Sequence, residues 1–285
     1  MVARREMDQQ AKFEAFAALH RGPGVLVMGN PWDAGTARLL EAAGFAALAT
    51  TSAGYAFSVG RLDSAAGLGR EEILGNAAEI VAATALPVTA DLEDGFGAAP
   101  ETCAETIAMA LEVGLVGGSI EDATGDGHAP IYGFDLAVER VRAAAEAARG
   151  KPFLLTARAE GCLWGEADLD QIIGRLVAFS EAGADVLYAP GLPDLAAIRA
   201  VCRAVDKPVN VVMGLRPPFH SVAELADAGV RRISVGGSFA RAAFGAVRAA
   251  AREVLEEGRF GYAETAMPGA EIAALMSGRK VPDRR

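Results

Sequence analysis

Two hydrophobic patterns alternate along the chain, and each predicts one kind of element. Short apolar runs, typical of strands buried on both faces, lie at Val25–Met28, Phe45–Ala49, Pro87–Glu93, Val116–Glu121, Phe153–Arg158, Asp185–Tyr188, Pro208–Val212 and Arg232–Val235. Segments with apolar residues at helical spacing follow them, at Ala34–Ala43, Glu71–Thr84, Pro100–Val113, Asp135–Ala148, Ala167–Ala182, Asp194–Ala204, Ser221–Ala228 and Phe239–Glu256. The pattern predicts eight strand–helix units in succession.

The regular succession of strands and helices predicts the architecture. Strands that alternate with helices form parallel sheets covered by helices on both faces. Glycine just past a helix end is a common stop signal, and four predicted helices end on one, at Gly44, Gly114, Gly183 and Gly229. Eight units in 285 residues predict a closed (β/α)8 TIM barrel. An open, doubly wound parallel sheet is the alternative.

Both ends of the chain extend this barrel, which we expect to form a single domain over residues 1–285. An N-terminal helix is predicted over about residues 10–20, where Phe13, Phe16 and Leu19 recur at helical spacing. A C-terminal helical extension covers about residues 262–285 and includes a short helix over Pro268–Gly278. The predicted barrel leaves this extension no strand to pair with.

Composition and charge exclude several classes of protein. A net charge of -10 argues against a nucleic-acid partner, because phosphates require a basic surface. The three cysteines have an odd count and no close spacing, which favours reduced thiols and a cytoplasmic location. The charged N-terminus has no apolar segment of the signal-peptide kind. Uncharged Ala42–Gly60 is long enough to span a membrane, but its Thr, Ser and Gly residues favour a buried strand and a loop.

An acidic strand end is the first candidate for chemistry. Side chains alternate faces along a strand, so Thr89, Asp91 and Glu93 are expected to share one face. Two carboxylates side by side require either a raised pKa or a cation. Gly95 and Gly97 follow and allow tight turns and the close approach of a ligand. This stretch therefore predicts half of a metal site.

Further polar residues follow the other predicted strands. Active sites of such barrels lie at the carboxyl ends of the strands, and the candidates there are Thr51, Ser52, Asp63, Glu121, Arg158, Glu160, Tyr188, Asn210 and Ser234. Several acids with His128 as the only nearby histidine favour a hard cation such as Mg²⁺. Zinc is disfavoured because no cysteine or histidine cluster exists.

Some of these residues have a plain structural interpretation. Asp94 and Asp122 can cap turns, stay solvated or form local ion pairs. Arg158 can pair with Glu121 or Glu160 instead of facing a substrate carboxylate. His128, in a glycine-rich loop, is as consistent with exposure as with catalysis. Gly236-Gly237-Ser238 can bind a phosphate at the start of the last helix, or Ser238 can simply cap that helix.

At this point the motifs resemble a known family. Asp91-Leu92-Glu93-Asp94-Gly95-Phe96-Gly97 resembles the Asp-x-Asp-x-Gly-Tyr-Gly motif of the isocitrate lyase / phosphoenolpyruvate mutase superfamily. Other segments fit the family's order, at Asn30–Asp33, Thr51–Gly54, Asp63, Ser119–Asp122 and Thr156–Arg158. The resemblance covers roughly residues 24–250, nearly the whole predicted barrel.

This resemblance implies a fold, a cofactor and a chemistry. It implies an (α/β)8 barrel whose last helix is swapped between subunits of a homo-oligomer, a dimer or a tetramer. It implies Mg²⁺ (or Mn²⁺) held by Asp91, Glu93, Glu121 and Asp63, and reactions of a small carboxylate through a metal-bound enolate. Substrate would be bound by Arg158 and held around Thr51, Ser52, Ala53, Gly95 and Asn210.

Departures from the family pattern narrow the reaction. Isocitrate and methylisocitrate lyases carry a Lys-Lys-Cys-Gly-His segment, whereas this chain has Ala123–Pro130, without cysteine or lysine. We therefore expect neither activity, but C–C cleavage of a small 2-oxo or 2-hydroxy dicarboxylic acid by decarboxylation or retro-aldol chemistry. A P–C bond phosphonomutase or phosphonopyruvate hydrolase is one alternative, and a non-catalytic metabolite-binding barrel is another. Glu160, His128 and Tyr188 are the candidate proton carriers, and the sequence does not rank them.

Overall fold

Eight parallel strands form a barrel in the computed structural model, which describes residues 8–63, 67–165 and 168–277. The strands are β1 Leu26–Met28, β2 Leu48–Ala49, β3 Val88–Asp91, β4 Gly117–Glu121, β5 Leu154–Arg158, β6 Val186–Tyr188, β7 Val209–Val212 and β8 Arg232–Ser234. Their order is β1-β8-β7-β6-β5-β4-β3-β2, and a parallel bridge between Gly29 and Leu48 brings the two outer strands together. The TIM barrel is confirmed, and the open sheet is wrong.

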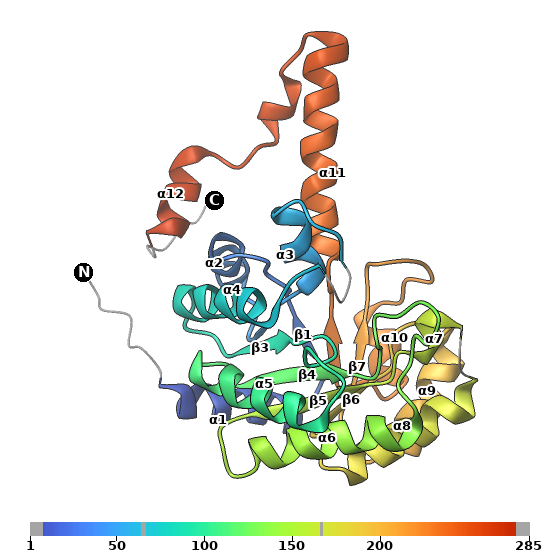
Figure 1. Cartoon of the computed structure of the whole chain (residues 1–285). Coiled ribbons are helices and arrows are strands. Elements are labelled where there is room, and N and C mark those ends of the chain that lie inside the picture. Colours follow the sequence, from blue (N-terminus) through green and yellow to red (C-terminus); the bar gives the residue numbers. More distant parts are fainter. Residues whose placement is uncertain (1–7, 64–66, 166–167, 278–285) are drawn as a thin grey trace.

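Helices surround this barrel (Figure 1). They are α1 Gln9–Arg21, α2 Ala34–Ala42, α3 Ser52–Ser58, α4 Arg70–Ala83, α5 Pro100–Glu112, α6 Phe134–Ala148, α7 Gly161–Trp164, α8 Leu169–Glu181, α9 Leu195–Ala204, α10 Val222–Asp227, α11 Ser238–Arg252 and α12 Gly269–Met276. A π-helical turn, η1 Glu253–Glu257, and a 3-10 turn, η2 Gly261–Glu264, connect the last two helices.

Helix ends follow the signals in the sequence. Asp33 caps α2, with its Oδ1 accepting from the Thr36 amide at 2.7 Å. The four glycines predicted to stop helices all adopt positive φ, of 96° at Gly44, 87° at Gly114, 110° at Gly183 and 100° at Gly229. These four stop signals are confirmed, because a side chain would be strained in that conformation.

The structure corrects two boundaries near the predicted site. Thr51–Gly54, expected as a loop, forms the start of α3, because the Thr51 hydroxyl accepts from the Gly54 amide at 3.2 Å and caps the helix. β3 ends at Asp91, so Glu93 is not in the strand and has a left-handed backbone with φ 48°. The turn that ends β3 is closed by the Gly95 amide, which donates to the Leu92 carbonyl at 2.9 Å.

Further observations concern the start of α8, the short helix α7 and the C-terminal extension. The helix predicted from Ala167 begins at Leu169, because Asp168 caps it; Ala167 lies outside the described residues. The short helix α7 was not predicted. Of the C-terminal extension, α12 packs on α2, and residues 278–285 lie outside the described part.

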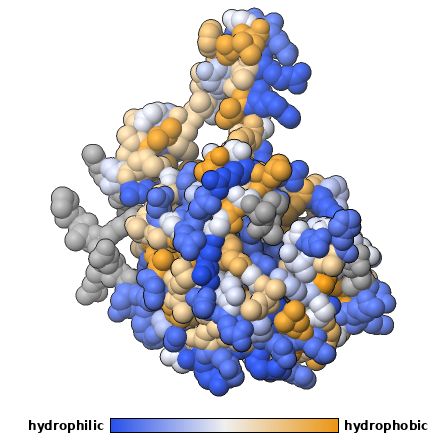
Figure 2. Space-filling model, in the orientation of Figure 1, coloured by the Kyte–Doolittle hydropathy of each residue, from blue (hydrophilic) through white to orange (hydrophobic). Residues whose placement is uncertain are grey.

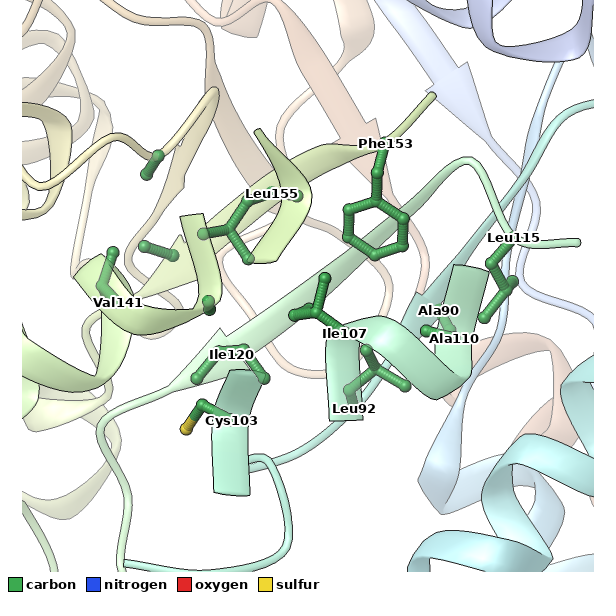
Figure 3. Packing of buried hydrophobic residues seen from close by; sticks show 14 of the residues in the cluster. Ala90, Leu92, Cys103, Ile107, Ala110, Leu115, Ile120, Val141, Phe153 and Leu155 are labelled. Atoms are coloured by element: carbon green, nitrogen blue, oxygen red, sulfur yellow. The ribbon is translucent and has the colours of Figure 1, made fainter. Parts of the chain in front are cut away.

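Leucine, isoleucine and phenylalanine side chains fill the space between strands and helices. Leu92, Ile107 and Ile120 are each at most 1% exposed and come from the turn directly after β3, from α5 and from β4. Figure 3 shows them together with Phe153 and Leu155 of the fifth strand–helix unit. Each such side chain contributes about 1.5–3 kcal/mol when fully buried, so this packing holds the third, fourth and fifth units in place.

One polar side chain closes the seam of the barrel. β2 is only two residues long, so little of its backbone can pair with β1. The buried amide of Asn30 compensates, because its Nδ2 donates to the Thr50 carbonyl at 3.1 Å and its Oδ1 accepts from the Val235 amide at 2.9 Å. Asn30 thereby connects the ends of β1, β2 and β8.

Helix α1 covers the amino ends of the strands. Phe16 packs in one cluster with Leu26, Met28 and Val116. His20, one turn later, is 6% exposed, and its Nδ1 donates to the Phe16 carbonyl at 2.8 Å, which leaves Nε2 as a buried acceptor with no partner in the described part of the chain. Burial, and then the positive charge of Arg232, lower the pKa of His20 to about 4.

Acid should therefore destabilise the protein through His20. Its pKa is about 6.5 when unfolded and about 4 when folded, so the unfolded chain binds the proton more tightly and stability falls as the pH drops between those values. We expect His20→Gln to remove about 3 kcal/mol of this pH dependence, because each tenfold difference in proton affinity corresponds to about 1.4 kcal/mol. Urea unfolding of both proteins from pH 7 to pH 4 measures it. Equal slopes for the variant and the wild type would contradict the assignment.

The C-terminal part of the chain projects from the barrel. In Figure 1, α11 rises away from the strands, and the chain returns through the two short turns to α12. Val247 is 69% exposed, Leu255 85% and Phe260 65%, and the orange surface of this arm in Figure 2 marks such apolar residues. No helix in the described part of the chain is long and apolar enough to cross a membrane. We propose that a second copy of the chain covers this arm, as expected for a swapped helix.

Charge on this arm should break the proposed oligomer. We expect Val247→Asp combined with Leu255→Asp to give monomers, because an interface cannot bury unpaired carboxylates. Light scattering coupled to size exclusion measures the mass of each species. Arg248→Ala, on the same helix, is the matched control and should keep the wild-type mass. A wild-type protein that is monomeric at every concentration would refute the proposal.

Candidate active site

A cavity of about 950 Å³ opens at the carboxyl ends of the barrel strands. Most of the predicted site residues line it, namely Thr51, Ser52, Ala53, Asp63, Asp91, Glu93, Glu121, Arg158, Glu160, Tyr188 and Asn210. Gly95 and His128 are not among the described residues of its wall. A Cβ at Gly95 would lie 2.9 Å from Cys103 Sγ, so this glycine packs against α5, and His128 is exposed in the loop after β4.

Arg158 lies at the centre of the acidic residues. Its Nη1 is 2.8 Å from Asp91 Oδ1, its Nη2 is 3.0 Å from Glu121 Oε2, and its Nε is 2.8 Å from Glu160 Oε1. The strands bring these groups together, because Glu121 and Arg158 are register partners on β4 and β5. In this structure Arg158 thus pairs with both glutamates that were considered as its structural partners, and with Asp91 as well.

Asp91 is held in place by groups at the end of β2. Its Oδ2 accepts from the Ser52 hydroxyl at 2.9 Å and from the Ser52 amide at 3.4 Å. Its own amide donates to the Thr50 hydroxyl at 3.0 Å. Both carboxylate oxygens of Asp91 therefore have donors, and the Ser52 amide, expected to hold substrate, points at Asp91 here.

The carboxyl group of Glu93 is buried and only incompletely hydrogen-bonded to the described residues. The residue is 8% exposed, and its Oε2 is buried without a hydrogen bond among the described residues. Burial, followed by the charges of Asp91, Asp63 and Asp94, raises the pKa of Glu93 to about 8. Burial and then Asp91 also raise the pKa of Asp63. Acidic side chains are therefore crowded on this side of the cavity, and each raises the pKa of its neighbours.

The donor set fits a divalent cation only in part. Within residues 8–63, 67–165 and 168–277, no three His, Cys, Asp or Glu side chains are close enough to hold a metal alone. Arg158 takes the central position where the sequence predicted an ion. Three carboxylates nevertheless face one guanidinium, and Glu93 Oε2 has no partner among the residues that the structure describes. Mg²⁺ commonly takes one or two carboxylates and completes its shell with water and substrate.

A second group of buried polar residues supports the site from behind. Asp122, 2% exposed, accepts from the Glu160 amide at 2.7 Å and from Arg175 Nη1 at 3.1 Å. Arg175 also donates to the Tyr132 carbonyl at 3.0 Å, and the Tyr132 hydroxyl donates to Asp94 Oδ2 at 3.1 Å. The local ion pair considered for Asp122 is confirmed. Asp94 is buried rather than solvated, and it caps the turn at Phe96.

The floor of the cavity contains a buried arginine that the sequence analysis did not select. Arg232 is 4% exposed; its Nε donates to Asn210 Oδ1 at 2.9 Å and its Nη2 donates to Thr156 Oγ1 at 3.0 Å. Asn210 Nδ2 in turn donates to Ser234 Oγ at 3.1 Å. Asn210 Oδ1 already accepts from Arg232 and Nδ2 already donates to Ser234, so one oxygen lone pair and one N–H remain for a ligand.

Tyr188 and Glu160 lie beside Arg158. The Arg158 guanidinium carbon is 5.1 Å from the centre of the Tyr188 ring, a cation–π distance. Burial raises the pKa of Tyr188 against the opposing charge of Arg158, so the phenol stays protonated and can act only as an acid. Gly236 and Gly237 also line the cavity, and α11 is capped by Gly237 rather than by Ser238.

A barrel with a charged cavity at the carboxyl ends of its strands is the architecture of an enzyme rather than of a structural protein. Comparison with known proteins gives the family. Residues 16–255 match the family profile described as phosphoenolpyruvate phosphomutase, and the chain belongs to this family, within the isocitrate lyase/PEP mutase superfamily. It is therefore an enzyme of the PEP mutase/isocitrate lyase type.

Individual relatives are similar over most of their length. The 2-methylisocitrate lyase of Escherichia coli K12 is 29% identical over 232 residues, 79% of this chain and 78% of that protein. A crystal structure from Burkholderia cenocepacia J2315, provisionally described as a lyase/mutase, is 56% identical, covers 96% of this chain and 98% of its own, and has a TM-score of 0.92. The crystal structure of 2,3-dimethylmalate lyase is 26% identical, covers 93% and 94%, and has a TM-score of 0.83.

Replacing Arg158 should lower the stability of the protein. We expect Arg158→Met to lower the free energy of unfolding by about 3–5 kcal/mol, because three carboxylates lose their cation. Urea unfolding at pH 7 measures the change. Arg61→Met is the matched control: Arg61 pairs with Glu72 at 2.7 Å, but the two side chains are 48% and 43% exposed, so the loss should stay below about 1 kcal/mol. Equal losses in the two variants would contradict the central role of Arg158.

Proposed function

We propose that the chain is a Mg²⁺- (or Mn²⁺-) dependent lyase that cleaves a C–C bond in a small 2-oxo or 2-hydroxy dicarboxylic acid. The observation that carries the proposal is the excess of carboxylates around Arg158, together with Glu93 Oε2, which has no partner among the described residues and lies in the same cavity. Lyases of this superfamily generally depend on a divalent metal. Such an ion, when bound, would stabilise negative charge that develops on a substrate oxygen.

Each residue has a role in this proposal. Asp91, Glu93, Glu121 and Asp63 would hold the metal directly or through water. Arg158 would exchange part of its ion pairing for a substrate carboxylate, since its planar guanidinium can bind two oxygens at once. Donors around Thr51 and Ala53, and the remaining N–H group of Asn210, would fix the second carboxylate, and Ser52 would contribute by exchanging Asp91 for the substrate.

The structure distinguishes between the three candidate proton carriers, Tyr188, Glu160 and His128. Tyr188 is protonated and lies next to Arg158, so it can donate a proton to a carbanion that forms after bond cleavage. Glu160 is 3% exposed and already accepts from Arg158 Nε, which makes it a positioning group for Arg158. His128 would need the loop after β4 to move, because its side chain is exposed in this structure. Tyr188 is therefore our first candidate.

Two findings bear on the bond that is cleaved. The loop over residues 123–130 lacks the cysteine and lysines of the methylisocitrate lyase motif, which favours a decarboxylation or retro-aldol reaction that needs little from this loop. The 2,3-dimethylmalate lyase, a lyase by name, has the same fold with a TM-score of 0.83. A P–C bond mutase or phosphonopyruvate hydrolase is the second candidate, because the family profile carries a phosphomutase description.

The setting of the enzyme is also part of the proposal. The three cysteines are free, and Cys103 is buried against the core, which fits a reducing compartment such as the cytoplasm. We propose a homo-oligomer, a dimer or tetramer, formed through the projecting arm. A small carboxylate is the proposed binding partner, and neither nucleic acid nor membrane is part of the proposal.

A substrate panel tests the reaction. Oxaloacetate, malate-type 2-hydroxy acids and phosphonopyruvate are incubated with the enzyme in Mg²⁺ or in EDTA, and products are identified by mass spectrometry. We expect C–C cleavage that requires Mg²⁺, and a loss of at least about 100-fold in Asp91→Ala, more than a typical outer-shell change. Asp170→Ala, an exposed acid on α8, should retain full activity.

Two results would decide against the proposal. Turnover of phosphonopyruvate alone would favour the P–C chemistry. Full activity of Asp91→Ala, with the variant folded by circular dichroism, would refute the metal assignment.

A further inference from the structure

A row of polar register partners runs across the barrel from the rim of the cavity toward its floor. Each member lies opposite the next on the neighbouring strand, in the order Glu121, Arg158, Tyr188, Asn210 and Arg232. All five line the cavity. Glu121 and Arg158 are the last residues of β4 and β5, whereas Arg232 is the first residue of β8, and the strands of a barrel are tilted to its axis. The row therefore descends from the rim and ends at Arg232.

Arg232 is a buried cation whose described partners are uncharged. It is 4% exposed, and its Nε and Nη2 donate to the amide oxygen of Asn210 and to the hydroxyl of Thr156. Its Nη1 is buried and has no partner among the described residues. Burial lowers the pKa of Arg232 to about 10, so the side chain remains charged at neutral pH. Arg158, in contrast, faces three carboxylates.

An uncompensated charge of this kind is costly in a protein interior. A buried ion destabilises the fold unless a counter-ion and hydrogen bonds replace the water that it has lost. An apolar side chain of similar length at position 232 would avoid this cost. Arg232 also lines the cavity, so the counter-ion can come from a ligand instead of from the protein. The charge therefore lies where an anionic ligand can compensate it.

Two neutral groups beside Arg232 can carry its effect to a ligand. Asn210 accepts from Arg232 with Oδ1 and donates to Ser234 Oγ with Nδ2 at 3.1 Å, which leaves one N–H for a ligand. The Ser234 hydroxyl accepts this bond and can turn its own proton toward the cavity, which it also lines. A cation that polarises such a chain of hydrogen bonds strengthens the bonds that the chain makes to an anion.

The other arginines of the cavity are less enclosed or already paired. Arg216 and Arg241 line the cavity as well, but both are exposed, so water and salt screen their charge. Arg158 is shared among three carboxylates. Among the described residues of the cavity wall, Arg232 is the arginine that is enclosed and has no carboxylate partner.

We propose that Arg232 is a positioning residue for the second carboxylate of the substrate. This inference rests on the proposed function, in which the first carboxylate lies at Arg158 and the metal. The second carboxylate is held at the floor by the remaining N–H of Asn210 and by the hydroxyl of Ser234. Arg232 does not contact it. The charge of Arg232 makes these two neutral donors select a carboxylate over an uncharged group of the same shape.

Two unreactive ligands of nearly equal shape test the role of this charge. Succinate carries two carboxylates, and succinamate has a carboxamide in place of one of them. Each is titrated by calorimetry into the full chain in the presence of Mg²⁺. We expect the wild type to bind succinate about tenfold more tightly, the usual difference between a charged and a neutral hydrogen-bonded group. In Arg232→Met this preference should fall to about twofold, the statistical value for two equivalent carboxylates.

Several results would overturn the inference. One is an equal preference for succinate in Arg232→Met and in the wild type. Another is a wild type that binds both acids equally or binds neither of them.

Two further variants separate charge from hydrogen bonding. Arg232→Gln keeps a neutral donor for Asn210, so it should lose the preference as Arg232→Met does, and it replaces that variant if the methionine protein does not fold. Arg231→Met is the matched control, because Arg231 donates to the Gly22 carbonyl and lies outside the cavity wall; it should keep the preference. A preference retained in Arg232→Gln, or lost equally in Arg231→Met, would refute the role of the Arg232 charge.

Failure of this inference and failure of the proposed reaction are distinguishable. A preference for succinate that depends on Arg232, without turnover of any acid in the substrate panel, would keep the role of Arg232 and refute the lyase. Mg²⁺-dependent cleavage of a dicarboxylate, together with an unchanged preference in both Arg232 variants, would keep the lyase and refute the role of Arg232.

Discussion

One guanidinium organises the functional end of this barrel. Arg158 is 15% exposed at its side chain and faces carboxylates from β3, from β4 and from the residue two positions beyond itself. Burial raises the pKa of both Glu121 and Glu160 against the opposing charge of Arg158, because one guanidinium cannot compensate three enclosed carboxylates. Burial first, and then the neighbouring carboxylates of Asp91, Asp63 and Asp94, raise the pKa of Glu93, and such a crowded set of acids makes the cavity attractive to a cation. The strand register that places Arg158 among these acids thus also determines the electrostatics of the cavity.

Much of the architecture could be predicted from the sequence because its signals are local. Strand and helix positions follow from hydrophobic spacing, and the glycine stops require only a residue without a Cβ. The acids of β3 could be found because carboxylates in a buried strand are rare. In these cases the residue and its neighbours along the chain are enough to predict the local structure.

The parts that sequence reasoning missed depend on contacts between distant segments. The central place of Arg158 among three acids requires the register of β3, β4 and β5. The short helices α3 and α7 lack a hydrophobic period, and α3 begins at a threonine cap that resembles an ordinary loop residue. Arg232 had a usable signal, since alternation along β8 puts it on the same face as Ser234. Its hydrogen bond to Asn210 could not be inferred without the fold.

The amide of Asn30 has a consequence for how the barrel holds its shape. Most neighbouring strands of the barrel are connected by several backbone hydrogen bonds. Between β1 and β2, the side chain of Asn30 supplies much of the connection. An aspartate in its place would keep the acceptor for Val235 and lose the donor for Thr50, setting a carboxylate against a carbonyl oxygen. The barrel would then open first between β1 and β2, close to Ser52 and to Asp91, which accepts a hydrogen bond from Ser52.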